Sequence, residues 1–393
     1  FTLDASDPAT PGDHRRVGVS YPDLANDVNP GDILLLDDGL ISMQVQSLDN
    51  GRVHCLVENG GVLKNRKGLN LQGGGLSVSG LAEHDLPHIE LAAEIGADYV
   101  AVSFVSSADD IDRARGLLRK AGSEASIVAK IERMEAIDNL EEICDTADVI
   151  MVARGDLGVE IGDEELPGLQ KRIIRKGIRH NRIVATATQM MQSMVENPIP
   201  TRAEVLDVAN AVLDGTDAVM LSAETAVGKH PVKVIEAMNR ICLGAERHFE
   251  AEGDVVHLNV RFERIDQAIA MAAMYMATNV SVQAIVALTE SGSTAQWLSR
   301  VQSSVPIYAF STNSASRRKM AMFRDVFPVK QEATSDDPDE VVGEAMRTLL
   351  AHGAVKDDDR IIVTMGDQMS KSGGTNTFRF IKLDAEGRAR YRV

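Results

Sequence analysis

Residues 127–132 read Ile-Val-Ala-Lys-Ile-Glu, a short apolar run that ends in two charged side chains. Amphipathic stretches such as 108–120 and 167–180 separate it from runs of the same kind, which occupy residues 99–104, 149–153, 183–188 and 218–222. Continuous apolar strands that alternate with helices are typical of a parallel sheet buried on both faces. The sequence between about residues 76 and 250 therefore predicts an α/β fold.

Polar side chains recur where these predicted strands end: Ser103, Lys130, Glu132, Arg154, Asp156, Thr188, Ser222 and Glu224. This placement is typical of the catalytic mouth of an eight-stranded (β/α)8 barrel. Only five strands are visible, so we expect three more to precede Phe1. The chain begins without Met, which agrees with a longer natural N-terminus.

The segments before and after this region have different patterns of predicted strands and helices. Residues 33–36, 40–45 and 52–57 predict short strands, joined by turns at Asp37-Asp38-Gly39 and Asn50-Gly51. From about residue 254, predicted strands at 282–288, 306–310 and 360–364 alternate with predicted helices at 265–279, 295–301 and 337–352. We expect a small β domain before the central region and a separate open α/β domain after it.

Charge and composition exclude several classes of protein. The 58 acidic and 41 basic residues give a formal net charge of −17, which disfavours nucleic-acid binding as the main role. No stretch of about 18 uncharged apolar residues occurs, so we expect no membrane span. The three cysteines lie far apart, which favours a reducing compartment over a disulfide framework or a zinc site.

The pair Lys130 and Glu132 is the strongest local indication of chemistry. The two residues are two positions apart in a predicted strand, so their side chains share one face. A carboxylate at a barrel mouth suits Mg²⁺, and an ammonium suits a phosphoryl group in transfer. A structural ion pair is the alternative interpretation.

Residues 151–158, Met-Val-Ala-Arg-Gly-Asp-Leu-Gly, predict a strand followed by the start of a short helix. Amides of Gly155 and Asp156 there could hold a carboxylate group, and Asp156 could be a second ligand of Mg²⁺. The alternative is a glycine turn with Asp156 as the N-cap of the helix.

Hydroxyl and carboxyl groups end the last two predicted strands. Thr188, Ser222 and Glu224 could bind a substrate or take part in proton transfer, or could simply cap strand ends. Thr201 and Glu204 have the spacing of a capping box, so we expect Glu204 to be structural.

The C-terminal region contains two loops rich in hydroxyl groups and glycine. Residues 288–294 predict a strand, a turn and a helix start, with the geometry of a phosphate cradle. Residues 370–376 form a second candidate, and together the two loops indicate a phosphorylated ligand.

Taken in order, these segments resemble the pyruvate kinase family. The matching stretches are Leu-Leu-Leu-Asp-Asp-Gly-Leu-Ile at 34–41, Val-Glu-Asn-Gly-Gly at 57–61, Arg-Lys-Gly-Leu-Asn-Leu at 66–71, Val-Ser-Phe at 102–104, Lys-Ile-Glu at 130–132, Met-Val-Ala-Arg-Gly-Asp-Leu-Gly-Val-Glu at 151–160, Ala-Thr-Gln-Met at 187–190, Pro-Thr-Arg-Ala-Glu at 200–204, Asp-Val-Ala-Asn-Ala-Val-Leu-Asp-Gly at 207–215, Met-Leu-Ser-Ala-Glu-Thr-Ala at 220–226 and Gly-Asp-Gln-Met-Ser at 366–370.

The resemblance implies three domains. Residues 1–78 would be part of a β-barrel lid, inserted after the third strand of the catalytic barrel. Residues 79–250 would supply strands four to eight of that (β/α)8 barrel, and residues 251–393 a C-terminal α/β regulatory domain. Because the first three barrel strands would be missing, we expect residues 1–393 alone to be inactive.

The implied reaction is Mg²⁺-dependent phosphoryl transfer from phosphoenolpyruvate to ADP, which gives pyruvate and ATP in the final step of glycolysis. By resemblance, Lys130 would stabilise the transferred phosphoryl group, and Glu132 and Asp156 would hold Mg²⁺ or Mn²⁺. The other roles implied are substrate binding by Arg154, Gly155, Asp156 and Thr188, catalysis by Thr188, Ser222 and Glu224 with proton delivery through the last two, and nucleotide binding by Lys67.

The resemblance also implies features outside the catalytic centre. We expect K⁺ as a second cation, with ligands that are not in this chain, a cytoplasmic location and a homotetramer. A phosphorylated allosteric effector would bind the turn that contains Thr289, Ser291, Gly292, Ser293 and Thr294.

Two other functions remain alternatives. One is a Mg²⁺-dependent lyase or aldolase that handles pyruvate enolates on a similar barrel. The other is a non-catalytic relative that senses a phosphorylated metabolite through its C-terminal domain.

Overall fold

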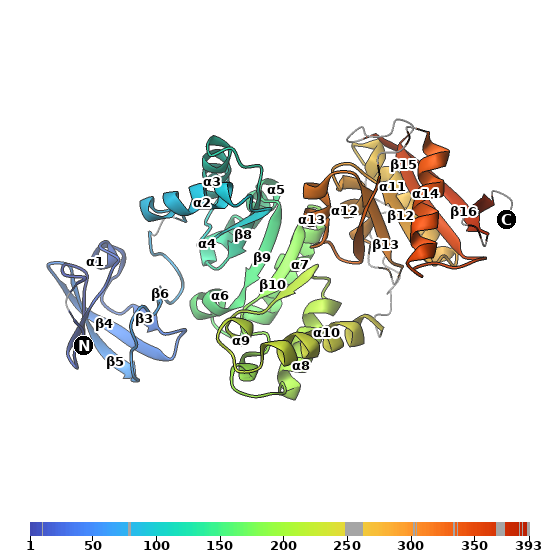
Figure 1. Cartoon of the computed structure of the whole chain (residues 1–393). Helices are drawn as coiled ribbons and strands as arrows, with labels where there is room; N and C mark the ends of the chain where they lie inside the picture. The colour runs from blue at the N-terminus through green and yellow to red at the C-terminus, as the bar shows by residue number, and fades with distance from the viewer. Residues whose placement is uncertain are drawn as a thin grey trace. The chain divides into compact units, whose positions relative to one another are not determined.

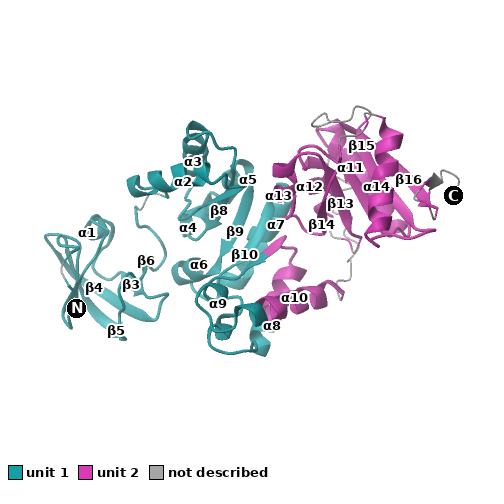
Figure 2. Ribbon diagram, in the orientation of Figure 1, with its two compact units in different colours: residues 1–204, 219–234 teal, residues 205–218, 235–393 magenta. Residues whose placement is uncertain are grey.

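The computed structural model describes residues 1–9, 11–77, 80–247, 262–301, 303, 305–332, 335, 337–366, 374–384, 386 and 388–390. The chain divides into two compact units, residues 1–204 with 219–234 and residues 205–218 with 235–393 (Figure 2). The domain limits expected at residues 78–79 and 250–251 lie outside the described residues.

A six-stranded sheet, here called the N-terminal sheet, begins the first unit; its strands are β1 (Thr2–Asp4), β2 (Arg16–Gly18), β3 (Ile33–Leu36), β4 (Ile41–Asp49), β5 (Arg52–Asn59) and β6 (Leu69–Leu71). They pair in the order β2-β1-β5-β4-β3-β6, mostly antiparallel, with α1 (Leu24–Asp27) beside them (Figure 1). Leu24 of α1 belongs to the core of this sheet. The predicted turn between β3 and β4 is confirmed. Asp37 and Asp38 have φ values of +52° and +56°, which tight hairpin turns require.

A five-stranded parallel sheet follows, built from β7 (Tyr99–Val102), β8 (Ser126–Ile131), β9 (Val149–Ala153), β10 (Ile183–Ala187) and β11 (Ala218–Met220). The strands lie side by side in chain order. Every residue of β9 and β10 is buried, as their continuous apolar composition predicts. The parallel sheet therefore brings the ends of successive strands to one edge.

Helices connect these strands: η1 (Glu83–Asp85), α2 (Leu86–Glu94), α3 (Ala108–Lys120), α4 (Met134–Asp138), α5 (Leu140–Thr146), α6 (Arg154–Ile161), α7 (Leu166–Arg179), η2 (Gln192–Val195), α8 (Arg202–Leu213), α9 (Ala223–Ala226) and α10 (Pro231–Arg247). The capping box is confirmed, because Thr201 N donates to Glu204 Oε2 at 2.7 Å and Glu204 N to Thr201 Oγ1 at 3.2 Å. Helix α7 packs tightly on the sheet at Gly177, where a Cβ atom would lie 2.6 Å from Val184 Cγ2.

The second unit contains another six-stranded sheet, built from β12 (Ala284–Leu288), β13 (Ile307–Ser311), β14 (Val326–Lys330), β15 (Arg360–Gly366), β16 (Thr375–Leu383) and β17 (Ala389–Arg390). The order is β14-β13-β12-β15-β16-β17, with the first four strands parallel. The helices are α11 (Ile265–Asn279), α12 (Ser293–Ser299), α13 (Ser314–Met320) and α14 (Pro338–Ala351).

This sheet has a hydrophobic core on each face. Alternate residues of β12 divide between them: Val286 packs in the cluster that contains Val341 of α14, and Ile285 in the cluster that contains Met274 of α11. The open α/β arrangement expected for this region is confirmed. The sequence patterns do not predict α13, β14, β16 and β17. None of the helices in the described residues has the length and apolar character needed to cross a membrane.

Candidate active site

The end of strand β8 carries an ion pair between Lys130 and Glu132. Lys130 Nζ lies 2.6 Å from Glu132 Oε1 and donates to Ser103 Oγ, just beyond β7, at 2.7 Å. The prediction that both side chains lie on one face of the strand is therefore confirmed.

Glu132 is almost completely buried, with 1% of its side chain exposed. Its Oε2 accepts a hydrogen bond of 2.7 Å from the amide of Phe104, a residue with φ of +54°. Burial raises the pKa of Glu132, the Lys130 ammonium and the Phe104 amide oppose that shift, and the charge of Asp156 adds to it. The carboxylate is thus held where a further positive charge would stabilise its ionised form.

Asp156 reaches the same place from the neighbouring strand. Helix α6 begins directly after β9 and carries Asp156 in its first turn, but the N-cap is Ala153, so the interpretation of Asp156 as the cap is wrong. Burial raises the pKa of Asp156, Lys130 opposes the shift, and Asp38 of the N-terminal sheet adds to it. One ammonium group therefore acts on two carboxylates from adjacent strands.

These two carboxylates are suitable ligands for a divalent cation. Hard cations such as Mg²⁺ prefer carboxylate oxygens and commonly take only one or two from the protein. Both acids have a pKa raised by burial, as expected for groups that lack enough positive charge around them. Among the described residues, no three His, Cys, Asp or Glu side chains gather closely enough to hold a metal ion. Substrate and water oxygens would have to complete the coordination.

A strained turn after β10 lies against the start of α6. Thr188 and Gln189 have φ values of +64° and +53°, which are uncommon for residues with side chains and, in a β-branched one, strained. Gly155 N donates to Thr188 Oγ1 at 2.8 Å. Buried Arg154 supports the turn, since its Nη2 donates to Thr188 O at 2.9 Å. The structure therefore brings the predicted substrate residues Gly155 and Thr188 into contact.

Comparison with known proteins identifies the family of the chain. A family model described as "Pyruvate kinase, barrel domain" matches residues 1–235, and one described as "Pyruvate kinase, alpha/beta domain" matches residues 267–381. The "Pyruvate kinase II" of Salmonella typhimurium is 49% identical over 390 residues, which cover 98% of this chain and 81% of the relative. The chain belongs to the pyruvate kinase family.

Two further pyruvate kinases support the assignment. That of Buchnera aphidicola subsp. Schizaphis graminum is 48% identical over 98% of this chain and 80% of its own length. That of Haemophilus influenzae is 47% identical over 96% of this chain and 79% of its own length. The chain is therefore a phosphotransferase of glycolysis, and its family implies phosphoenolpyruvate and ADP as substrates and a divalent metal as cofactor. The lyase or aldolase and the non-catalytic sensor are set aside.

Ser222 and Glu224 lie beyond β11, near the strained turn of this pyruvate kinase. Glu224 is 1% exposed and accepts hydrogen bonds from two backbone amides, Met191 N at 3.1 Å and Ser222 N at 2.8 Å. The Glu224 carboxylate thus joins the segments that follow β10 and β11.

Lys67 lies in the loop that precedes β6. Its ammonium pairs with Asp37, and that hydrogen bond and charge raise the pKa of Lys67. A cavity of about 710 Å³ adjoins it, and the residues that line this cavity include Lys67, Arg66, Phe104 and Arg133.

Sequence reasoning missed two carboxylates near the site. Asp38 was interpreted only as part of a turn, although its charge acts on Asp156. Glu160 ends the motif at 151–160; burial raises its pKa to about 7 and the Glu135 charge adds to the shift. The adjacent acids in the turn were a signal for Asp38, and the spacing of one helical turn from Asp156 was a signal for Glu160.

The predicted effector turn lies in the second unit, between β12 and α12. Gly292 has φ of +86°, and its amide donates to Thr289 Oγ1 at 3.0 Å. Thr294 is buried, with its hydroxyl oxygen 2.7 Å from that of Thr375, the first residue of β16. Ser291 and Ser293 complete the turn. Residues 370–373 of the second candidate loop lie outside the described residues, as do residues 367–370 of the motif at 366–370.

Proposed function

We propose that Lys130, Glu132 and Asp156 form the catalytic centre of this pyruvate kinase. The observation that carries the proposal is the single ammonium of Lys130, which pairs with Glu132 at 2.6 Å and also opposes the raised pKa of Asp156. Glu132 and Asp156 would hold Mg²⁺ or Mn²⁺, which when bound neutralises negative charge on the enolpyruvate and phosphoryl oxygens.

Lys130 would stabilise the phosphoryl group during transfer. Its side chain is 24% exposed, so it can meet a substrate, whereas Glu132 beneath it cannot. A positive group held in place in a largely desolvated site stabilises developing negative charge better than a mobile one does. The pairing with Glu132 and Ser103 fixes the ammonium in this way.

The turn at Thr188 would bind the carboxylate group of phosphoenolpyruvate. Amides of Gly155 and Asp156 lie at the start of α6, where backbone N–H groups favour an anion. Thr188 Oγ1, which now accepts from Gly155, would contact the substrate beside them. Arg154 would act on the substrate through the turn that it supports.

Ser222 and Glu224 would act in delivering a proton to the enolate of pyruvate. The proposal is supported by the hydrogen bond from Ser222 N to Glu224 Oε2, which orients both groups beyond β11. Proton transfer needs a donor within hydrogen-bond reach, directly or through one water molecule.

Lys67 would bind the phosphates of ADP from the N-terminal sheet, which we propose is the lid domain at residues 1–78. Its pairing with Asp37 and the adjoining cavity support this role. Nucleotide phosphates would then compete with Asp37 for the ammonium.

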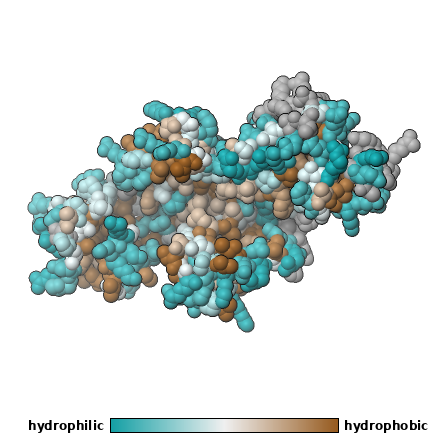
Figure 3. Space-filling view, viewed as in Figure 1, coloured by the Kyte–Doolittle hydropathy of each residue, from teal (hydrophilic) through white to brown (hydrophobic). Residues whose placement is uncertain are grey.

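We propose that the five-stranded sheet belongs to a closed (β/α)8 barrel at residues 79–250, followed by a regulatory domain at 251–393. A barrel of this type needs eight strands, and β7 and β11 are open edges of the described sheet. Helix α2, which precedes β7, exposes Leu86 and Leu91, and Ile95 directly after it is also exposed; hydrophobic residues are visible there (Figure 3). Three further strands would cover such edges.

Four other features remain proposals that rest on family resemblance. We propose K⁺ as second cation, a homotetramer, and a phosphorylated effector at the turn 289–294, where Gly292 and neighbouring hydroxyl groups support anion binding. A cytoplasmic location is supported by the three free cysteines and by the glycolytic substrates.

The test is a titration of the full-length protein with Mn²⁺. Electron paramagnetic resonance measures the Mn²⁺ affinity, and an assay of pyruvate formation measures the activity. Glu132→Gln and Asp156→Asn should each weaken Mn²⁺ binding at least about tenfold, because each removes one charged ligand. Glu164→Gln, at an exposed position just after α6, is the control. Unchanged Mn²⁺ affinity in both site variants would contradict the proposed metal site.

A further inference from the structure

The chain leaves the N-terminal sheet through residues 72–77, Gln-Gly-Gly-Gly-Leu-Ser, here called the return segment. Gly73 N donates to Glu160 O at 2.9 Å, and Gly75 N to Glu135 Oε1 at 3.1 Å. A Cβ atom at Gly74, where φ is +79°, would lie 3.2 Å from Met134 Cβ and 3.5 Å from Glu160 Oε2. The glycines therefore let the return segment run closely over α4 and α6.

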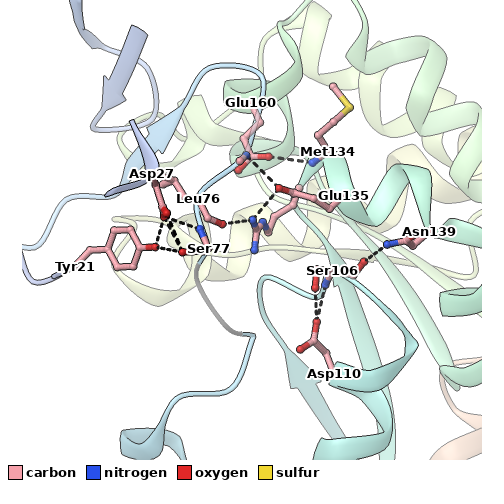
Figure 4. A network of polar contacts seen from close by, with 12 residues as sticks. Tyr21, Asp27, Leu76, Ser77, Ser106, Asp110, Met134, Glu135, Asn139 and Glu160 are labelled. Carbon is pink, nitrogen blue, oxygen red and sulfur yellow. Dashed lines mark hydrogen bonds and ion pairs between the residues drawn. The ribbon is translucent and has the colours of Figure 1, made fainter. Parts of the chain in front are cut away.

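The other end of the return segment is fixed to the N-terminal sheet. Ser77 N donates to Asp27 Oδ2 at 2.7 Å, and the Tyr21 hydroxyl bonds both Asp27 and Ser77 (Figure 4). Leu76 is buried in the core of that sheet. Residues 76 and 77 must therefore follow any displacement of the N-terminal sheet.

Glu135 and Glu160 belong to the segments that carry the proposed metal ligands. Glu135 follows Glu132 by three residues, and Glu160 follows Asp156 by one turn of α6. Glu160 Oε2 also accepts from Met134 N at 3.0 Å, which joins the end of α6 to the start of α4 (Figure 4). The Glu135 carboxylate and the Glu160 backbone carbonyl thus accept hydrogen bonds from the return segment, and both residues adjoin the segments that carry the proposed metal ligands.

Arg133 completes the connection. Its Nη2 lies 3.0 Å from Glu135 Oε1 and also donates to Leu76 O. The side chain is 6% exposed, and that of Glu135 is 34% exposed. The guanidinium therefore orients Glu135 toward the return segment instead of leaving it free in solvent.

We propose that Glu135 and Glu160 are positioning residues that couple the position of the N-terminal sheet to the arrangement of Glu132 and Asp156. The inference rests on the proposed metal site. The coupling free energy between two sites is the same in both directions. If the return segment stabilises the arrangement of the metal ligands, metal binding should therefore stabilise the return segment. The coupling passes through Gly73 and Gly75.

Hydrogen–deuterium exchange of the full-length protein tests this coupling, with Mn²⁺ alone as the probe. In the unmodified protein, Mn²⁺ should slow exchange in residues 72–77 at least about threefold. Glu135→Ala should abolish that response while Mn²⁺ affinity stays within about threefold, because the ligands remain. Glu135→Gln keeps an acceptor for Gly75 N and should restore the response.

Controls separate this inference from the proposed metal site. Glu164→Ala changes an exposed carboxylate near the end of α6 and should respond as the unmodified protein does. Glu135→Asp, too short to reach Gly75 N, replaces Glu135→Ala if the latter does not fold. The coupling is overturned if Mn²⁺ slows exchange in residues 72–77 of Glu135→Ala or Glu135→Asp as much as in Glu164→Ala. It is also overturned if Mn²⁺ does not slow this exchange in the unmodified protein. Undiminished Mn²⁺ binding in Glu132→Gln overturns the metal site instead.

Discussion

Lys130 and Glu132 form a 2.6 Å ion pair in which the acid is buried and the base remains partly exposed. The exposed partner is the one that can meet a substrate, and the buried partner fixes it. The two charges differ in what their removal leaves behind: the loss of Lys130 leaves a buried carboxylate without its counter-ion, which costs more than leaving a partly exposed ammonium without its partner.

Replacement of Lys130 by Met should lower kcat by about 10²–10³-fold or more, because the charge that stabilises the phosphoryl group in transfer is lost. The KM for phosphoenolpyruvate should change little, since that charge acts mainly in the transition state. Steady-state kinetics of full-length Lys130→Met, beside Lys120→Met at the exposed end of α3, provide the measurement. A kcat near that of the control would remove Lys130 from the mechanism.

Replacement of Thr188 by Val should raise the KM for phosphoenolpyruvate about tenfold, whereas Thr188→Ser should change it less than threefold. Valine keeps the β-branched shape but loses the hydroxyl that contacts Gly155 N, and serine keeps the hydroxyl. Since φ at this position is +64°, serine should also relieve some backbone strain and raise the melting temperature. Equal KM values in the two variants would argue against a substrate contact.

Gly177 and Gly168 provide a matched pair within helix α7. Gly177→Ala should destabilise the protein by about 1–3 kcal/mol, because its Cβ would lie 2.6 Å from Val184 Cγ2. Gly168→Ala, with no atom within 4 Å of its Cβ, should stabilise the helix by about 0.5–1 kcal/mol. Urea unfolding followed by circular dichroism measures both. If the two variants change the free energy of unfolding in the same direction, the short distance to Val184 is not the reason that position 177 lacks a side chain.

The acid at position 325 should make stability depend on pH. Burial raises the pKa of Asp325 to about 6 from 3.8; Arg324 opposes the shift, and Glu246 and Asp217 add to it. Between pH 3.8 and about 6, the Asp325 carboxyl is protonated in the folded state and ionised in the unfolded state. The stability that Asp325 contributes is therefore greatest below about pH 4 and is lost as the pH rises through 6.

Asp325→Asn should therefore be more stable than the unmodified protein at pH 7.5, by up to about 3 kcal/mol, and no more stable near pH 4. Asparagine also suits the φ of +59° at this position. Urea unfolding at both pH values, beside exposed Asp357→Asn, measures the difference. A stability difference that does not vary with pH would contradict the raised pKa.

The sequence predicted the elements whose patterns are local. The apolar runs became strands, and the spacing of Lys130 and Glu132 placed both on one face, because strand geometry alone determines that face. The reciprocal hydrogen bonds of Thr201 and Glu204 likewise follow from spacing along one helix end.

What the sequence did not reveal depends on contacts between distant residues. Strand β14 was missed because Pro328 interrupts its apolar pattern, yet it pairs with β13 in a parallel register. Asp38 lies near Asp156 only once the turn between β3 and β4 is placed beside α6. No spacing rule joins residues separated by more than a hundred positions.

The five strands β7 to β11 lie side by side in the order in which the ribosome makes them. Each strand can therefore dock on its predecessor as soon as its connecting helix has emerged, without waiting for later parts of the chain. The acid at position 132 follows an earlier strand than the acid at position 156, so the segments that carry the two acids can pack in the order of synthesis.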